Sequence, residues 1–225
     1  TKVSSTYFKK SCKHAFDTID REGGVMSIFT VLDLVAIAVG ALFGAAIASK
    51  QKAPLVGVVL LSVITALGGG MLHDVLLDTD VLALTNSWYI PMAVASGLLM
   101  LPFAERITQH STIGLCLDAA TLAMFVLVGT EKAISLNTTA SAAILIGVIT
   151  AIGGGTLANV LQGKLPVFLE RGPWYASAAV VGAGCYVTMN QWLGDAELRL
   201  STVTLVFFMT FLSGKFGWNA PALTK

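Results

Sequence analysis

The chain has 225 residues, of which 55% are hydrophobic and only 12% are charged, and its formal net charge is +1. A soluble domain carries about a quarter charged residues, so these few charged groups cannot cover a globular surface. The composition therefore excludes a soluble enzyme, a disordered chain and a disulfide scaffold, gives no reason to expect nucleic acid as a partner, and indicates an integral membrane protein.

Seven apolar blocks follow a polar N-terminal segment, and each is long enough to cross a membrane as a helix. They lie at residues 26–48, 55–77, 88–104, 113–130, 139–161, 174–192 and 198–217. Short links join most of them, so successive helices are expected to be antiparallel neighbours in one bundle. We expect residues 1–25 to form a polar tail that is not a signal peptide, and residues 218–225 to form a C-terminal tail.

Lysines and arginines near the spans bear on the orientation of the chain in the membrane. The two sides of the membrane carry equal numbers of lysines and arginines when the N-terminal tail is counted. The links between spans favour an outside N-terminus and a cytoplasmic C-terminus.

An internal repeat organises the sequence. Residues 63–70 (VITALGGG) recur as residues 148–155 (VITAIGGG), 85 positions later. Two further matches are Leu32-Asp33 with Leu117-Asp118 at the same offset, and Trp88-Tyr89 with Trp174-Tyr175 at 86 positions. Each copy holds three spans, and because three is odd the second copy enters the membrane from the opposite face. We therefore predict an all-α membrane protein of two inverted three-helix repeats, 26–112 and 113–197, with a seventh helix at 198–217.

Three consecutive glycines lie inside the middle span of each repeat, which is the second or fifth helix of the predicted fold. Each glycine costs about 1 kcal/mol of helix propensity relative to alanine, and consecutive residues point in different directions around a helix. We therefore predict a kink or an unwound turn at each triplet, lining a water-filled cavity. Close helix packing is the alternative. The six residues are Gly68, Gly69, Gly70, Gly153, Gly154 and Gly155.

Polar residues flank both triplets and complete a predicted ion path. Thr65 and Thr150 precede the triplets, His73 and Asp74 follow the first, and Asn159 follows the second. An ionisable side chain at membrane depth indicates function. The alternatives are that His73 and Asp74 are solvated loop residues, and that the threonine hydroxyls bond to preceding carbonyl groups.

Three more polar residues are expected to support this path. Asp33 and Asp118 either cap a helix end or bond to the free backbone of a neighbouring broken helix. Lys132 lies either at the membrane interface or reaches back into a pore. We find no nucleophile–base pair, nucleotide loop or metal-ligand cluster in the sequence, and therefore predict no enzyme activity, no cofactor and no metal site.

Taken together, the paired triplets, the matched aspartates and the seventh span resemble prokaryotic TRIC (trimeric intracellular cation) channels, a family related to glycine-transporter-like domains. The resemblance covers about residues 28–217 and includes Gly-Thr-Glu-Lys-Ala at 129–133. It implies a homotrimer in the prokaryotic inner membrane, surrounded by membrane lipids. It also implies one hourglass pore per protomer between the kinked second and fifth helices, permeable to K⁺ and less selectively to Na⁺.

The sequence departs from the family where many relatives have Arg-Asp after the glycines. Here His73-Asp74 follows the first triplet, and Ala158-Asn159 stands at the equivalent place in the second repeat. Because the missing arginine is a fixed positive charge, its absence should favour the passage of cations. The rival interpretation is a secondary transporter of glycine or another small solute, in which the same broken helices form an occluding site.

Overall fold

The computed structural model describes residues 28–106, 112–166, 169 and 174–218. Within these ranges the chain is helical and contains no strand. The expected polar tail at 1–25 lies outside the described residues, as does the C-terminal tail apart from Trp218.

Helices follow one another closely along the described chain. They are α2 (Ile28–Lys50), α3 (Leu55–Leu76), the short α4 (Leu82–Thr85), α5 (Tyr89–Met100), the 3-10 helix η1 (Leu101–Arg106), α6 (Thr112–Ser135), α7 (Ala140–Leu161), α8 (Tyr175–Met189) and α9 (Asp195–Phe216). Five of them, α2, α3, α6, α7 and α9, are long and apolar enough to cross a membrane, whereas α5 and α8 are apolar but shorter. The structure is therefore an all-helical membrane protein with five clear spans.

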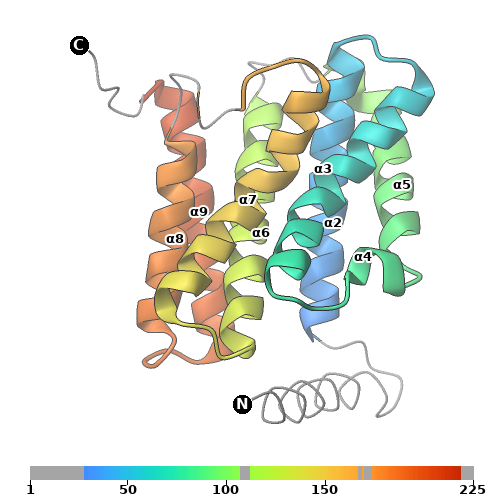
Figure 1. Ribbon diagram of the computed structural model, residues 1–225. Coiled ribbons are helices and arrows are strands. Elements are labelled where there is room, and N and C mark those ends of the chain that lie inside the picture. The colour runs from blue at the N-terminus through green and yellow to red at the C-terminus, as the bar shows by residue number, and fades with distance from the viewer. Residues whose placement is uncertain (1–27, 107–111, 167–168, 170–173, 219–225) are drawn as a thin grey trace.

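The long helices stand side by side in one bundle and alternate in direction (Figure 1). Helix α3 packs against α7 in the middle, α5 packs on α2 and α3, and α8 and α9 pack on α6. Corresponding helices of the two halves run in opposite directions: α2 against α6, α3 against α7, and α5 against α8 (Figure 1).

Large apolar side chains cover much of the outer surface. Examples with more than half of their surface exposed are Val56, Leu60, Leu99, Leu145 and Leu200. In a soluble protein such an apolar surface would be an association site or an aggregation hazard. On a bundle of apolar helices it is the surface that contacts lipid chains.

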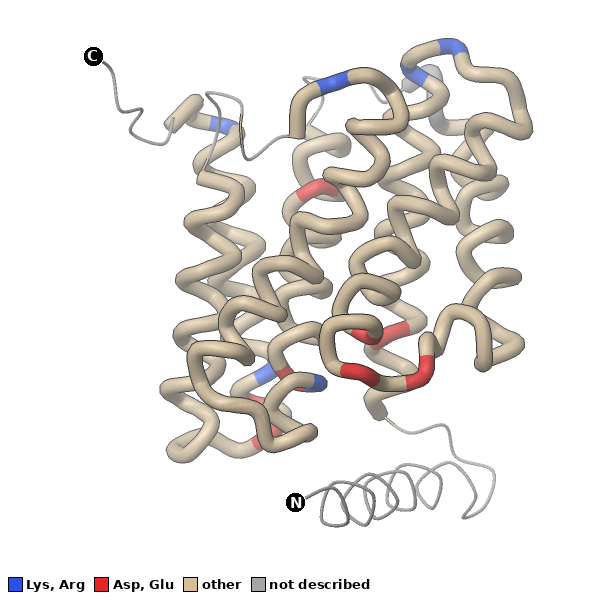
Figure 2. The backbone as a smooth tube through the Cα atoms, in the orientation of Figure 1, with Lys and Arg blue, Asp and Glu red and all other residues tan. Residues whose placement is uncertain are grey.

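Charged residues divide the bundle into two unlike ends (Figure 2). We call the end that bears Lys50, Lys52, Lys164 and Lys215 the lysine end. The opposite end, which we call the ion-pair end, carries buried pairs of opposite charge formed by Asp74 with Lys132 and by Glu131 with Arg199.

The 85-residue offset recurs in the backbone of the turns. After α2 the amide of Ala53 donates to the Ala48 carbonyl, and after α6 the amide of Thr138 donates to the Ala133 carbonyl, both at 3.3 Å. The left-handed residues of these turns also correspond, with Lys52 at φ 56° and Asn137 at φ 55°. The turns after α3 and α7 match in the same way, with Asp78 at φ 53° and Gly163 at φ 69°. The same turn geometry therefore occurs in both halves of the chain.

Both glycine triplets lie inside continuous α-helix. The unwound turn that the sequence suggested is therefore wrong for both segments. The middle glycine of each triplet instead allows close contact of α3 with α7. A Cβ atom on Gly69 would overlap the carbonyl oxygen of Thr150, and one on Gly154 would overlap that of Thr65. Because a backbone carbonyl cannot move aside as a side chain can, this crossing requires glycine at both positions.

Candidate functional site

Asp74 is the centre of a buried polar cluster at the ion-pair end. Its side chain comes from the last turns of α3 and is almost inaccessible to solvent, as is that of His73. Lys132 from α6 donates to Asp74 Oδ1, and His73 Nδ1 lies 2.9 Å from the same oxygen. The other carboxylate oxygen accepts the backbone amide of Leu82, at the start of α4, at 2.9 Å. The alternative that His73 and Asp74 are solvated loop residues is therefore wrong.

A second carboxylate, Asp33 of α2, lies near this cluster. The Tyr89 hydroxyl from α5 donates to Asp33 Oδ2 at 2.6 Å. Neither alternative foreseen for Asp33, a helix cap or a bond to broken backbone, describes this pairing. The tyrosine was missed by sequence reasoning as a functional residue, although its place in the repeated Trp-Tyr pair was a usable signal.

Between these groups lies a small cavity with room for about one water-sized molecule. Its polar lining comes from Asp33, His73, Asp74 and Tyr89. Gly70, the third glycine of the first triplet, also lines the cavity and adds no side chain to it. A Cβ atom on Gly70 would meet only His73 Nε2, at 3.9 Å, and that nitrogen has no hydrogen-bond partner among the described residues. The cavity therefore joins two carboxylates and an imidazole inside an apolar bundle.

The second half contains an equivalent but less charged site. Tyr175 of α8 donates to Asp118 Oδ1 at 3.2 Å, as Tyr89 does to Asp33. The third glycine of the second triplet, Gly155, lies beside this tyrosine: a Cβ there would meet only its hydroxyl, at 4.0 Å. Asn159 takes the place of Asp74 and is partly buried.

The structure thus brings the predicted site residues together in two groups rather than one. Asp33, Gly70, His73, Asp74 and Lys132 gather toward the ion-pair end. Asp118, Gly155 and Asn159 lie in the parts of α6 and α7 near the lysine end. The contact between Gly69 and Gly154 separates the two groups.

Thr65 and Thr150 do not offer their hydroxyls to either group. Each is fully buried and donates to the carbonyl four residues earlier, that of Leu61 or Ile146, at 2.7 Å. Gly44 and Gly129 pack directly on these two threonine side chains. The alternative of a bond to the preceding carbonyl therefore describes both threonines.

A further ion pair joins α6 to α9. Arg199 donates through Nε and Nη2 to Glu131 Oε1 at 2.8 and 2.6 Å, and its guanidinium lies 5.4 Å from the ring centre of Phe29. Glu131 and Lys132 are adjacent in sequence and bond to different neighbours. Arg199 was missed as a site residue by sequence reasoning, because nothing in the pattern says which helix α9 packs against.

The described residues include no group of three or more histidine, cysteine, aspartate or glutamate side chains that could hold a metal ion. What the geometry offers is carboxylate and hydroxyl oxygen close to the helix crossing, suited to a small cation that has lost part of its water.

Fold and site together define an α-helical membrane protein made of two like halves, with a buried polar site in each. The profile of a family described as glycine transporter matches residues 30–105 and again 115–191, once in each half. The chain belongs to this family, and its fold is that of the prokaryotic TRIC channels.

Two similar proteins are known from their sequences. The UPF0126 inner membrane protein YadS of Escherichia coli is 33% identical over 181 residues, which cover 78% of this chain and 87% of YadS. The UPF0126 membrane protein YvgT of Bacillus subtilis is 29% identical over 196 residues, covering 86% of this chain and 94% of YvgT. With the apolar helices, these relatives show a multi-pass integral protein of the inner membrane.

Two solved structures are similar over nearly their whole length. One, described as the structural basis for conductance through TRIC cation channels, has a TM-score of 0.77 and 27% identity, covering 88% of this chain and 98% of that one. The TRIC orthologue from Rhodobacter sphaeroides has a TM-score of 0.73 and 30% identity, covering 84% and 95%. The resemblance drawn from the sequence is confirmed.

Proposed function

We propose that the protein is a monovalent cation channel, permeable to K⁺ and less selectively to Na⁺, with one pore in each protomer of a homotrimer. The observation that carries the proposal is the buried cluster of Asp33, His73 and Asp74 beside the glycine crossing of α3 and α7. Two carboxylates in a low-dielectric bundle attract cations and exclude anions. The similarity to TRIC cation channels supports the same conclusion.

In this proposal the pore runs between α3 and α7 and connects the two polar groups. The halves are related by a pseudo-two-fold axis in the membrane plane, which puts the narrowest point near the midplane, where Gly69 and Gly154 meet. Conduction requires α3 and α7 to bend or separate at the triplets. Three glycines lower the free energy of such a bend, because they add flexibility and no side chains that would collide.

Lys132 regulates access to the first group. Its ammonium group bonds to Asp74, the carboxylate that a permeating cation would use. A conducting state therefore requires either that Lys132 withdraw from Asp74 or that the cation pass on the Asp33 side of the cavity. Asp118, Gly155 and Asn159 form the second, less charged vestibule.

A carrier of glycine or another small solute is the alternative, and the family description is its support. The cavity argues against it, because a site with room for about one water-sized molecule does not enclose glycine.

Single-channel recording of the purified protein in planar bilayers tests the proposal. We expect unitary currents whose reversal potential in a KCl gradient follows K⁺ rather than Cl⁻. Native mass spectrometry of the same preparation should show three copies. Saturable glycine flux without unitary currents would support the carrier and overturn the channel.

A further inference from the structure

At the lysine end, the end of α2 meets the end of α7. The side-chain amide of Gln51 donates to the Gln162 side-chain oxygen and joins the two links. Lys50 and Lys52 flank Gln51 in the sequence, and Lys164 follows Gln162 by two residues. Figure 2 shows lysines or arginines at this end of the bundle. Segments 49–54 and 161–166 contain no aspartate or glutamate. We call these two segments the lysine corner.

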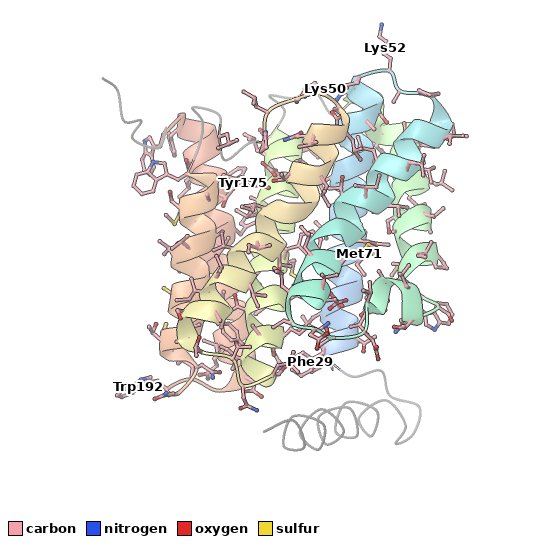
Figure 3. All side chains as sticks on the ribbon, in the orientation of Figure 1. Phe29, Lys50, Lys52, Met71, Tyr175 and Trp192 are labelled. Atoms are coloured by element: carbon pink, nitrogen blue, oxygen red, sulfur yellow. The ribbon has the colours of Figure 1, made fainter. Side chains whose placement is uncertain are left out.

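Several hydrogen-bond donors in this corner lack acceptors. Lys50 Nζ, Ser49 Oγ and Gln162 Nε2 are withdrawn from water, yet none has a hydrogen-bond partner among the described residues. Lys164 is close enough for its charge to repel that of Lys50. Lys52 extends away from the bundle at the same end (Figure 3). Like charges that repel one another and buried donors without acceptors are both unfavourable, and an anion with several oxygens would relieve the repulsion and the unmade bonds.

The other half of the molecule supplies an internal comparison. By the 85-residue offset, Lys50 corresponds to Ser135, Lys52 to Asn137 and Lys164 to Thr79. The turns have the same hydrogen bonds and the same left-handed residues, so the turn geometry does not require lysine. The equivalent corner carries Asp78 instead. The positive charge is therefore particular to the lysine corner.

We propose that the lysine corner binds a phosphate-class anion, supplied either by an anionic lipid headgroup or by free phosphate. The corner lies where helices end, which is the depth of lipid headgroups, and basic pockets between transmembrane helices recognise such groups. A bound anion would contact the links that follow α2 and α7, and so would tie the two halves together at this end. The inference is independent of ion conduction.

Lipid binding by the purified full-length protein tests this inference. The probes are phosphatidylglycerol, phosphatidylcholine as the uncharged comparison, and inorganic phosphate, with affinities measured by native mass spectrometry for the lipids and calorimetry for phosphate. We expect Lys50→Gln and Lys164→Gln each to weaken phosphatidylglycerol binding about fivefold, and the double variant about 25-fold. Lys215→Gln, at the same end but on α9, should change it less than about twofold.

The source of the anion follows from the phosphate measurement. If millimolar phosphate binds the parent and the double variant loses it, the site recognises the phosphate group alone; if phosphatidylglycerol binds and phosphate does not, the lipid is the ligand. Lys50→Arg with Lys164→Arg should retain binding, which separates lost charge from damaged folding. The proposal would be overturned if the parent and both single variants bound phosphatidylglycerol equally and the parent either bound no phosphate or bound it no better than the double variant. An equal loss in Lys215→Gln would also overturn it, since the attraction would then be non-specific.

Discussion

In the first half of the molecule Tyr89 donates to Asp33, and in the second half Tyr175 donates to Asp118 at the equivalent position. The crossing of α3 and α7 also has equivalent contacts from both halves, because Gly69 lies against the Thr150 carbonyl and Gly154 lies against the Thr65 carbonyl. These shared contacts position the helices, and they recur because the helices of the two halves pack in the same way.

The charges, by contrast, are not repeated. His73 and Asp74 correspond to Ala158 and Asn159, and Lys132 corresponds to Ile47. Among the described residues, the two buried ion pairs therefore lie at one end, and Lys50, whose ammonium group has no hydrogen-bond partner among them, lies at the other. The repeat therefore supplies the scaffold, while single differences between the halves make the two ends of the bundle chemically unlike. The variants below test this division between scaffold and chemistry.

The largest effect is expected at Asp74. Asp74→Asn leaves the mostly buried Lys132 ammonium without its carboxylate, which should lower the free energy of unfolding by about 3 kcal/mol. Asn159→Ala, at the equivalent position, should change it by less than about 0.5 kcal/mol. Unfolding in detergent measures both. Adding Lys132→Met to Asp74→Asn should restore most of the loss; if the double variant is no more stable than Asp74→Asn, the buried charge is not its cause.

Substitution of the middle glycine at the crossing should destabilise the protein equally in both halves. Gly69→Ala and Gly154→Ala each force α3 and α7 apart and should lower the free energy of unfolding by about 2 kcal/mol. Gly70→Ala and Gly155→Ala are the matched controls, because a Cβ there has space. They should be neutral or stabilising by up to about 1 kcal/mol, through helix propensity. Similar losses at all four positions would contradict the assignment of the crossing to the middle glycines.

The two equivalent tyrosine–aspartate pairs should differ slightly in how much each contributes to stability. Tyr89→Phe removes a 2.6 Å bond and Tyr175→Phe a 3.2 Å bond. We expect losses of about 1.5 and about 1 kcal/mol in the free energy of unfolding, because both leave a carboxyl group with one donor fewer. A larger loss for Tyr175→Phe would show that bond length does not rank the two sites.

The smallest effect is expected from a positive charge placed at His73, which corresponds to Ala158 in the second half. Its imidazole faces Asp74 on its own helix, Lys132 of α6, and Asp33 and Tyr89 across the cavity. The substitution His73→Arg adds a permanent positive charge beside the proposed cation path. The K⁺ conductance of this variant should therefore be about twofold lower than that of the parent.

Bilayer recordings of the parent and two variants check this effect. His73→Gln, which adds no charge, is the matched control and should conduct more K⁺ than His73→Arg. Equal K⁺ conductance in His73→Gln and His73→Arg would show that charge at this position does not affect the cation path.

Much of this fold is predictable because hydropathy is a local property. The seven apolar blocks coincide with α2, α3, α5, α6, α7, α8 and α9, although α5 gives way to the 3-10 helix η1 from Leu101 and α8 ends at Met189. The tyrosines and aspartates that the sequence repeat matches also bond to each other in the structure, Tyr89 to Asp33 and Tyr175 to Asp118.

The glycine triplets show where such prediction stops. Three glycines in a row are equally compatible with an unwound turn and with a tight crossing, and only the neighbouring helix decides between them. Here α3 and α7 pack closely enough that the middle glycines are required by contact, and both helices stay continuous.

The sequence by itself determined which segments form apolar helices and which polar side chains lie within them, because both depend on a residue and its near neighbours along the chain. Only the tertiary structure decided the partners: Asp33 with Tyr89, Asp74 with Lys132, and Glu131 with Arg199. A buried charge must find its counterpart on another helix, and which helices adjoin depends on how the whole bundle packs.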